Sequence, residues 1–556
     1  MSSDRLIYLP LGGCGEVGMN AYVYGFGPEG KERLILVDLG VTFPDMDGAP
    51  GVDLILPDLT WLIERRDRLE AIIITHGHED HVGALGHLWG ELRVPVYARA
   101  FTARLAALKF QEHGHPVEQI RTVGPRPEVT QIGPFGVQFV PISHSIPETS
   151  VMILDTPAGR VVHGADFKLD PDPVVGEPFD PAVFEAIGDE GVKALVCDST
   201  NVAVDHPGRS EATLAEPLRE LVAGAPGMVV ATTFASNLAR VYMLARAAQE
   251  AGRNVCVLGR AMQKMLRVAQ EAGVMTAFPP TVSAEEAAEM PRQNLLLIVT
   301  GSQGERRAAS AQLSRGRYLG LQMQPGDLFL FSSKTIPGNE RGVIRIINAF
   351  SEMGVEVIDD SSRRYHVSGH ANGPDLERFH ALLRPDMILP NHGEHRMLSA
   401  HARLAAKSGI ASEVVTNGMM TDLTGETPRV VEYVETGRVY VDGTVKVGAL
   451  DGVVRNRIRM ALNGIAVVNV ILEDNTLLGD PWVELMGLAE TGRRGAALAE
   501  TMEAEMADWL EGAGRRLIAD DSAVEDGLKR IARQVAMEEI GKKPEVVVIL
   551  SRLSDD

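Results

Sequence analysis

The sequence predicts an α/β protein of several domains, and three observations carry this prediction. Residues 1–205 contain short β-branched runs that end in polar or glycine-rich turns, with amphipathic stretches between some of them, which is typical of an α/β sandwich. From 206 to 360, strand-like and helix-like segments alternate, which favours a parallel sheet. After residue 446, two amphipathic helices and a closing strand predict a small α+β domain.

The composition agrees with a protein that has more than one core. The chain has 556 residues, of which 45% are hydrophobic and 23% charged, and this length exceeds what a single core usually serves. The formal net charge of −21 argues against a protein that coats nucleic acid nonspecifically, because that affinity comes largely from lysine and arginine. It does not exclude an enzyme that acts on nucleic acid.

The cysteines and the apolar segments indicate a cytoplasmic protein. Cys14, Cys197 and Cys256 are widely spaced and odd in number, so the sequence offers neither a disulfide framework nor a C-x-x-C metal knuckle. The first residues show no secretory signal, and no stretch reaches the roughly 18 apolar residues that span a bilayer. We therefore expect neither secretion nor membrane insertion.

The segment "GGCGEVG", residues 12–18, imitates a dinucleotide-binding fingerprint. Gly13, Gly15 and Gly18 give G-x-G-x-x-G after an apolar run, and Asp38 lies about twenty residues further on. The fingerprint requires a helix to begin here, whereas "MNAYVYGFG" continues with the alternation of a strand. The segment therefore predicts a tight turn between two strands.

The segment "THGHEDHVGAL", residues 75–85, predicts a metal site. His76, His78, Asp80 and His81 form H-x-H-x-D-H directly after an apolar run. Imidazole is the usual nitrogen ligand of zinc, and adjacent imidazoles are costly at a buried strand end unless a cation binds them. His76 and His78 can point one way from an extended loop, while Asp80 and His81 point another way, which indicates two metal positions.

Three later residues of the right type each end a predicted strand. His144 ends "VPISH", Asp166 ends "VVHGAD", and His392 lies in "LPNHGEH". A single strand-end histidine or aspartate is more often a core residue or a turn residue. Together with H-x-H-x-D-H, these residues supply the ligands that two metal positions still need.

This set resembles the metallo-β-lactamase superfamily, and later motifs resemble its β-CASP branch of nucleic-acid-processing enzymes. "CDST" with Asp198 is similar to the acidic motif of that branch, and "HVSGHA" and "LPNHGEH" are similar to its histidine motifs. The order of motifs up to about residue 446, followed by a C-terminal extension, resembles the bacterial ribonuclease J family. Met19 is a departure, because relatives tend to carry a basic residue there.

The resemblance implies a domain order and a ligand assignment. It implies a metallo-β-lactamase αββα sandwich interrupted by an inserted β-CASP domain: sandwich 1–205, insertion 206–360, sandwich 361–446, linker 447–465 and C-terminal dimerisation domain 466–556. It implies two divalent ions per chain, zinc or alternatively manganese. By resemblance, one ion would lie on His76, His78 and His144, the other on Asp80, His81 and His392, with Asp166 bridging them.

The resemblance also implies residue roles. Asp80, Asp198 and His370 would be catalytic, with His370 at the scissile phosphate and Asp198 orienting the neighbouring site. A pocket for a terminal 5′-phosphate would be formed by residues that precede helices: Ser236, Asn237, His366, Ser368, Gly369, His370 and Ala371. Capping of the helices by Ser236 or Asp375 is the alternative.

The function implied is hydrolysis of single-stranded RNA in RNA maturation and decay, including processing of ribosomal RNA. The expected direction is 5′-to-3′ from 5′-monophosphate ends, with internal cleavage as a second activity. A homodimer or tetramer and protein partners of RNA decay are expected by the same resemblance. Three alternatives stay open: a DNA-processing enzyme of the same branch, a hydrolase of small esters or thioesters, and a noncatalytic RNA-binding scaffold.

Overall fold

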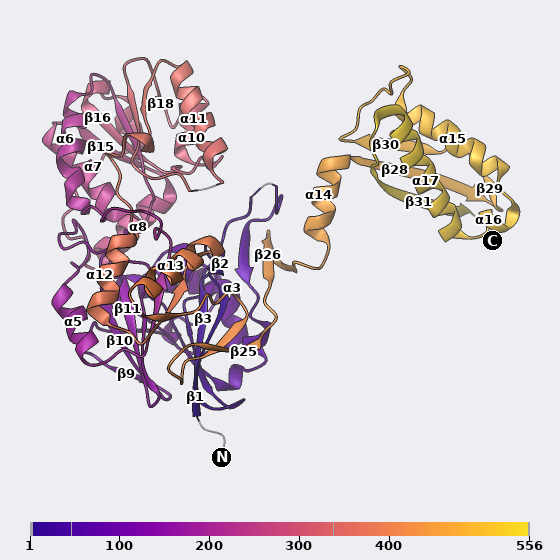
Figure 1. Cartoon of the computed structure of the whole chain (residues 1–556). Coiled ribbons are helices and arrows are strands. Elements are labelled where there is room, and N and C mark those ends of the chain that lie inside the picture. Colours follow the sequence, from indigo (N-terminus) through magenta and orange to yellow (C-terminus); the bar gives the residue numbers. More distant parts are fainter. Residues whose placement is uncertain (1–3, 46, 337, 554–556) are drawn as a thin grey trace. The chain divides into compact units, whose positions relative to one another are not determined.

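The computed structural model describes residues 4–45, 47–336 and 338–553, and the chain divides into two compact units (Figure 1). Unit 1 comprises residues Met1–Thr42 and Ile55–Arg438, and unit 2 comprises Phe43–Leu54 and Val439–Asp556. No helix of the described part is both long and apolar enough to cross a membrane.

Two sheets of unit 1 pack face to face. The strands of the first sheet run in the order β25 (Arg429–Tyr433), β24 (Met419–Asp422), β1 (Asp4–Gly12), β3 (Ala21–Pro28), β4 (Arg33–Val37), β6 (Leu69–Ile73), β7 (Val96–Ala98) and β8 (Ile120–Thr122). The strands of the second run in the order β23 (Ala411–Ser412), β21 (Met387–Asn391), β13 (Ala194–Asp198), β12 (Gly159–His163), β11 (Ser150–Thr156), β10 (Phe135–Pro141) and β9 (Thr130–Ile132).

The core between these sheets explains their sequence pattern. Tyr24 and Ile35 from the first sheet and Phe139 and Leu389 from the second belong to one buried cluster. Helices cover the outer faces, so the central strands are apolar on both sides. Covering the first sheet are α3 (Leu85–Leu92) and α4 (Ala100–Glu112), and covering the second are α5 (Pro181–Asp189), α12 (Gly373–Leu383) and α13 (His395–Lys407).

A third sheet is inserted into the second one along the chain. The chain leaves the second sheet after β13 and returns at β21, which pairs in parallel with β13 from Ala194↔Met387 to Asp198↔Asn391. The inserted strands run in the order β15 (Asn254–Leu258), β16 (Leu295–Val299), β14 (Val229–Thr232), β19 (Leu328–Phe331) and β20 (Glu356–Ile358), all parallel. Its helices include α6 (Ala215–Gly224), α7 (Leu238–Glu250), α8 (Arg260–Glu271), α10 (Ala309–Ser314) and α11 (Glu340–Glu352).

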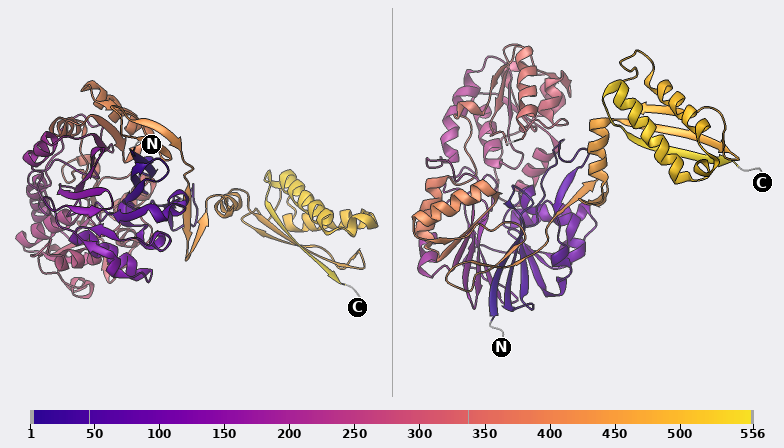
Figure 2. Two further views of the ribbon diagram at one scale, coloured as in Figure 1. Left: turned by 90° about the horizontal axis from the view of Figure 1, so that it is seen from below. Right: turned by 45° about the vertical axis from the view of Figure 1, so that its right-hand side comes forward.

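Unit 2 has a sheet with one covered face. β28 (Ile465–Glu473) pairs with β29 (Thr476–Leu477), β30 (Trp482–Met486) and β31 (Glu545–Leu553). Alternate residues of β28 are buried against α15 (Leu498–Gly512) and α17 (Asp521–Ile540), and Figure 2 shows both helices on the same face. The opposite face carries exposed apolar side chains, with Trp482 at 62% and Ile549 at 50% exposure.

The glycine-rich segment connects two strands, as predicted, but it is not a tight turn, because it includes the short strand β2 (Cys14–Gly15), which pairs with β22 (Gly393–Glu394). It leads from β1 into β3, and these strands pair antiparallel, with Gly12 opposite Ala21. The helix N-terminus that a dinucleotide fingerprint requires is therefore not formed after Gly18. Gly13, Gly15 and Gly18 all have positive φ, which an L-residue rarely adopts.

Gly40 allows the segment that contains H-x-H-x-D-H to pack against residues 39–41, which follow β4. The backbone NH groups of Leu39 and Val41 donate to the carbonyls of His81 and Glu79, at 2.8 and 3.0 Å. A Cβ on Gly40 would lie 1.6 Å from the carbonyl oxygen of Asp80, so the two backbones are too close for any side chain.

We predict that Gly40→Ala lowers the free energy of unfolding of unit 1 by about 1–3 kcal/mol or more, because the backbone of residues 79–81 must move. Gly224→Ala is the matched control, since a Cβ there meets nothing within 4 Å. Urea unfolding followed by tryptophan fluorescence measures the difference. Equal midpoints for the two variants would contradict this role of Gly40.

Candidate metal centre

Seven side chains at the ends of strands converge on one buried cluster, here called the metal centre. His76 and His78 follow β6, and α2 (Glu79–Val82) carries Asp80 and His81. His144 follows β10, Asp166 follows β12 and His392 follows β21. The metal centre therefore comprises His76, His78, Asp80, His81, His144, Asp166 and His392.

The first group of donors consists of three histidines. Nδ1 of His78 lies 3.1 Å from Nε2 of His76 and 3.2 Å from Nε2 of His144. Three nitrogens that face one another at these distances make an imidazole triad of the kind that binds a divalent transition metal.

The second group consists of Asp80, His81 and His392. Oδ2 of Asp80 lies 3.2 Å from Nε2 of His392 and 3.5 Å from Nε2 of His81. The mixture of nitrogen and carboxylate donors suits zinc and also manganese.

Asp166 lies between the two groups. Its Oδ2 is 3.3 Å from Nε2 of His81 and 3.8 Å from Nε2 of both His76 and His144, and its Oδ1 is 3.6 Å from Nδ1 of His392. Its Oδ1 is buried and accepts no hydrogen bond from any described residue. A buried carboxylate oxygen without a donor is what a cation ligand requires, so this donor set fits divalent metal ions.

The charges of the imidazoles differ between the groups. Burial lowers the pKa of His76 and His144 well below the usual value, so their nitrogen lone pairs are available. Burial also opposes charge on His81, but the carboxylates of Asp166 and Asp80 raise its pKa to about 10. The protonated imidazole of His81 thus supplies the positive charge beside Asp166 that a bound metal ion would otherwise supply.

Several ligands are oriented by hydrogen bonds from residues to which the sequence analysis gave no such role. Nδ1 of His81 donates to Asp38 at 2.8 Å, and Nδ2 of Asn20 lies 3.0 Å from Nε2 of His81. Nδ1 of His144 donates to the carbonyl oxygen of Gly369 at 2.6 Å. Such outer partners fix the ring orientation of metal-binding histidines.

Asp38 is the residue that the dinucleotide interpretation would have used for a ribose. Instead it directly follows β4 and also accepts hydrogen bonds from the NH and hydroxyl of Thr75. Asp38 follows a strand, as Asp166 does, and this position was the sequence signal that could have identified it as part of the site.

Asp198 and His370 form a hydrogen-bonded pair beside the metal centre. Nδ1 of His370 donates to Oδ2 of Asp198 at 2.7 Å, and Asp198 is 1% exposed while His370 is 21% exposed. These two residues, Asp166 and His392 have potential ligand atoms within 4.8 Å of one another. Because Asp198 holds Nδ1, Nε2 of His370 is the nitrogen left for a substrate.

Three residues at or beside the strand ends of the metal centre have strained backbone conformations. Asp38, Ala165 and His392 have φ values of 62°, 49° and 48°, in the left-handed region that non-glycine residues rarely adopt. Strain of this kind persists where surrounding structure over-determines it, which is common at functional sites.

The segments expected to bind a 5′-phosphate are connected through Arg240. Asn237 caps α7, since its side chain accepts from the NH of Arg240, and the fully buried Arg240 donates to the carbonyl oxygen of Tyr365, next to His366. Ser236 is not the cap, and α12 is capped by Asn372 with Asp375.

Two of the backbone NH groups of residues 368–371, those of His370 and Ala371, already donate hydrogen bonds in the structure. Oγ of Ser368 accepts from Asn201 at 2.8 Å and from the NH of His370 at 3.2 Å, and the NH of Ala371 donates to Phe167 at 2.6 Å. Nη2 of Arg240 and Oγ of Ser333 are buried and lack partners among the residues described. The guanidinium of Arg240 reaches His366, because its Nη1 lies 3.4 Å from Nδ1 of that residue, and the sequence prediction did not include Arg240.

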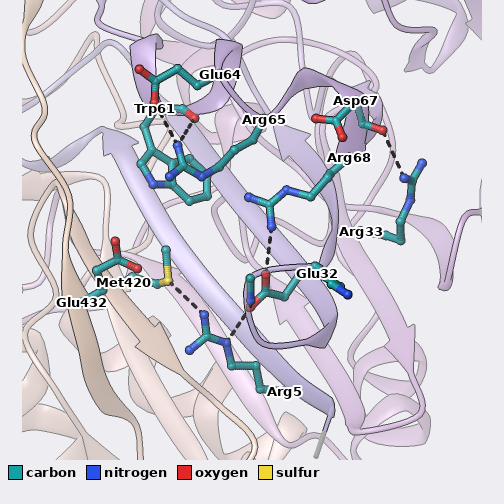
Figure 3. Close-up of a pocket in the computed structure, with 12 residues that line it drawn as sticks. Arg5, Glu32, Arg33, Trp61, Glu64, Arg65, Asp67, Arg68, Met420 and Glu432 are labelled. Carbon is teal, nitrogen blue, oxygen red and sulfur yellow. Dashed lines mark hydrogen bonds and ion pairs between the residues drawn. The ribbon is translucent and has the colours of Figure 1, made fainter. Parts of the chain in front are cut away.

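A pocket of about 670 Å³ lies at the opposite end of β4 from Asp38 (Figure 3). It contains several arginines, but Arg5 and Arg68 both pair with Glu32, and Arg65 stacks on Trp61. Its lining includes none of the residues of the metal centre.

Comparison with known proteins agrees with the geometry. Family models match for the metallo-β-lactamase superfamily (residues 14–230), the ribonuclease J β-CASP domain (226–350), the Zn-dependent metallo-hydrolase RNA specificity domain (356–415) and the ribonuclease J C-terminal domain (452–553). The expected metallo-β-lactamase domain with a β-CASP insertion and a C-terminal domain is therefore confirmed.

The similarity to individual relatives extends over nearly the whole chain. Ribonuclease J of Sinorhizobium meliloti is 39% identical over 99% of this chain and 98% of its own length. Ribonuclease J of Mycobacterium tuberculosis is 34% identical over 98% and 97%. A solved structure of a protein of unknown function from Enterococcus faecalis V583 has the same fold, with a TM-score of 0.52 and 14% identity over 75% of this chain and 100% of that chain. The chain belongs to the ribonuclease J family.

Proposed function

We propose that this protein is a metal-dependent ribonuclease that removes nucleotides from the 5′ end of single-stranded RNA, with internal cleavage as a second activity. The observation that carries the proposal is the metal centre with Asp198 and His370 beside it, in a chain of the ribonuclease J family. We place the protein in the cytoplasm, in RNA maturation and decay including ribosomal RNA processing, and Cys14, Cys197 and Cys256 are all free thiols.

The residues of the metal centre would form two ion-binding groups. His76, His78 and His144 would hold one divalent ion, Asp80, His81 and His392 a second, and Asp166 would contact both. When bound, such a pair of ions supplies Lewis acidity for the attack of water on phosphorus and offsets the charge of the phosphate. Zinc suits the imidazole triad best, and manganese is the alternative.

The remaining residues bind and orient the substrate. Asp38 and Asn20 hold the ring of His81, and Asp198 holds the ring of His370. Nε2 of His370 would contact the scissile phosphate and give a proton to the leaving oxygen. Asp198 is almost fully buried, so water does not compete for its carboxylate, which stabilises the charged imidazole of His370.

Replacement of His76 and His78 by alanine together should abolish RNA hydrolysis, by more than about 100-fold, because both donors belong to one triad. Metal content should fall as well, while far-ultraviolet circular dichroism stays that of a folded protein. His395→Ala, which removes an exposed imidazole from α13, should retain activity.

The assay uses labelled RNA and DNA of one sequence with all three proteins. RNA hydrolysis by the double variant at the normal rate would refute the site. Preferential DNA hydrolysis by the wild type would instead favour a DNA-processing enzyme, and hydrolysis of small esters alone would favour an esterase.

The direction of cleavage depends on the phosphate pocket at Ser236, Asn237, His366, Ser368, Gly369, His370 and Ala371. A terminal phosphate held there would place the first phosphodiester bond at the metal centre, so its binding energy would be used for positioning. Arg240 supports the pocket, because it connects the start of α7 to residues 365 and 366.

We predict that RNA with a 5′-monophosphate is degraded at least about 10-fold faster than RNA with a 5′-hydroxyl, the loss expected for one charge-assisted hydrogen bond. A 5′-triphosphate should also be slower, because it adds bulk and charge. Resolving 5′-labelled products by length provides the measurement. Equal rates for the three ends, or shortening from the 3′ end, would rule out the pocket.

We further propose that the chain forms a homodimer through the exposed sheet face of unit 2. Trp482, Asn469 and Ile549 lie side by side across three strands of this face, and Met486 and Val547 are also exposed. Apolar side chains gathered on one face of a sheet indicate an association surface, and a second copy is the occupant we propose.

A variant with Trp482→Glu and Ile549→Glu should be monomeric at micromolar concentration, because two carboxylates would be buried per subunit. Tyr433→Glu is the matched control, since Tyr433 is 78% exposed in unit 1. Light scattering separates the results: a dimeric double variant, or a monomeric wild type, would eliminate this interface.

A further inference from the structure

A second group of potential metal ligands lies behind the metal centre, here called the rear cluster. It consists of Cys197, the residue before Asp198 on β13, His380 on α12 and His401 on α13. Their exposures are 0%, 1% and 0%, and their ligand atoms all lie within 4.8 Å of one another. None of the three belongs to the seven residues of the metal centre.

The surroundings of the rear cluster are apolar. Cys197 belongs to a buried cluster with Leu376, Phe379 and Leu383 of α12 and Ala405 of α13. Imidazoles are costly in such a core unless all of their polar atoms are satisfied. Two of them together therefore need a specific explanation.

Hydrogen bonds satisfy this cluster only in part. Nε2 of His380 lies 3.1 Å from Nε2 of His401, and Nδ1 of His401 lies 2.9 Å from the hydroxyl of Ser199. Nδ1 of His380 is buried and has no partner in the described part of the chain. The two Nε2 atoms face each other, which is the arrangement that a shared cation requires, and Nδ1 of His380 takes no part in it.

The donor types suit a thiophilic divalent cation. Burial lowers the pKa of His380 well below the usual value and that of His401 to about 4, so both rings are neutral and keep a lone pair. Two nitrogens bound to tetrahedral zinc at about 2.0–2.1 Å are roughly 3.3 Å apart, close to the 3.1 Å between the two Nε2 atoms. Ser199 would fix the ring of His401 from its other nitrogen, as outer partners of metal-bound histidines do.

We propose that Cys197, His380 and His401 bind a structural zinc ion that is separate from the metal centre. Binding replaces the proton of the Cys197 thiol, which is released to solvent, and forms one bond from sulfur and one from Nε2 of each imidazole; a water molecule would complete the tetrahedron. The thiolate charge offsets half of the charge of the ion, which makes it acceptable in an apolar core.

The position of the ion gives it a function. β13 carries Asp198 next to Cys197, α12 begins shortly after His370, and α13 begins shortly after His392. The three elements joined by the rear cluster are therefore those that position Asp198, His370 and His392. A zinc ion here fixes their positions relative to one another.

Cobalt distinguishes this site from the metal centre, because a thiolate bound to Co²⁺ gives an intense near-ultraviolet charge-transfer absorption that imidazole and carboxylate ligands do not. The full-length protein is produced in cells grown with cobalt in place of zinc, so that the ion enters during folding. We expect the absorption in the wild type and also in the His76→Ala, His78→Ala double variant. Cys197→Ala should abolish it and lower the cobalt content by about one equivalent per chain.

Cys256→Ala is the matched control and should keep the absorption, because Cys256 is equally buried but lies on β15 of the inserted sheet. His380→Gln removes one imidazole and retains polarity, so it should weaken the absorption and lower the cobalt content even if Cys197→Ala does not fold. Absence of the absorption in the wild type, its persistence in Cys197→Ala, or an unchanged spectrum in His380→Gln would overturn the proposal. The rear cluster would then be a hydrogen-bond chain only.

Discussion

The buried carboxylate of Asp166 is the constraint on which the rest of the site depends. It is 2% exposed, and its two oxygens lie within 3.8 Å of His76, His81, His144 and His392. A carboxylate without water must be compensated by positive charge, and the surrounding imidazoles compensate it only when some of them are protonated. Divalent ions between these donors remove that conflict, because the histidines then bind as neutral ligands. The composition of the metal centre follows from this requirement.

The fold satisfies the requirement by ending several strands at one place. β6 and β10 come from different sheets of the sandwich, and β12 and β21 flank β13 in the second sheet. The insertion between β13 and β21 adds α7 and the serines after β19 without disturbing their parallel pairing. Positive φ values at Asp38, Ala165 and His392 show that the strand ends bend sharply to direct their side chains. Gly40 contributes as well, because only a glycine allows residues 79–81 to approach the segment that follows β4.

The sequence predicted the parts of this arrangement that depend on local spacing. H-x-H-x-D-H lies within one loop, and the motifs at His144, Asp166, Asp198 and His392 each follow an apolar run, so the resemblance to a known family could be recognised. The positioning of His81 by Asp38 could not be predicted in this way, because it depends on the docking of α2 against the end of β4. The rear cluster could not be predicted either. Its members, Cys197, His380 and His401, do not belong to one sequence motif, and they meet only when α12 and α13 pack on β13. The capping of α7 by Asn237 instead of Ser236 is a choice between adjacent polar residues that propensity does not decide.

The most direct test of the central claim is the variant Asp166→Asn, which keeps the shape of the side chain and removes its charge. The measurement is the number of divalent ions per chain, determined by elemental analysis of the purified folded protein together with its rate of RNA hydrolysis. If Asp166 holds the ions together, metal content should fall and hydrolysis should decrease by more than about 100-fold. Full metal content with a normal rate of hydrolysis would show that the metal centre does not depend on this carboxylate.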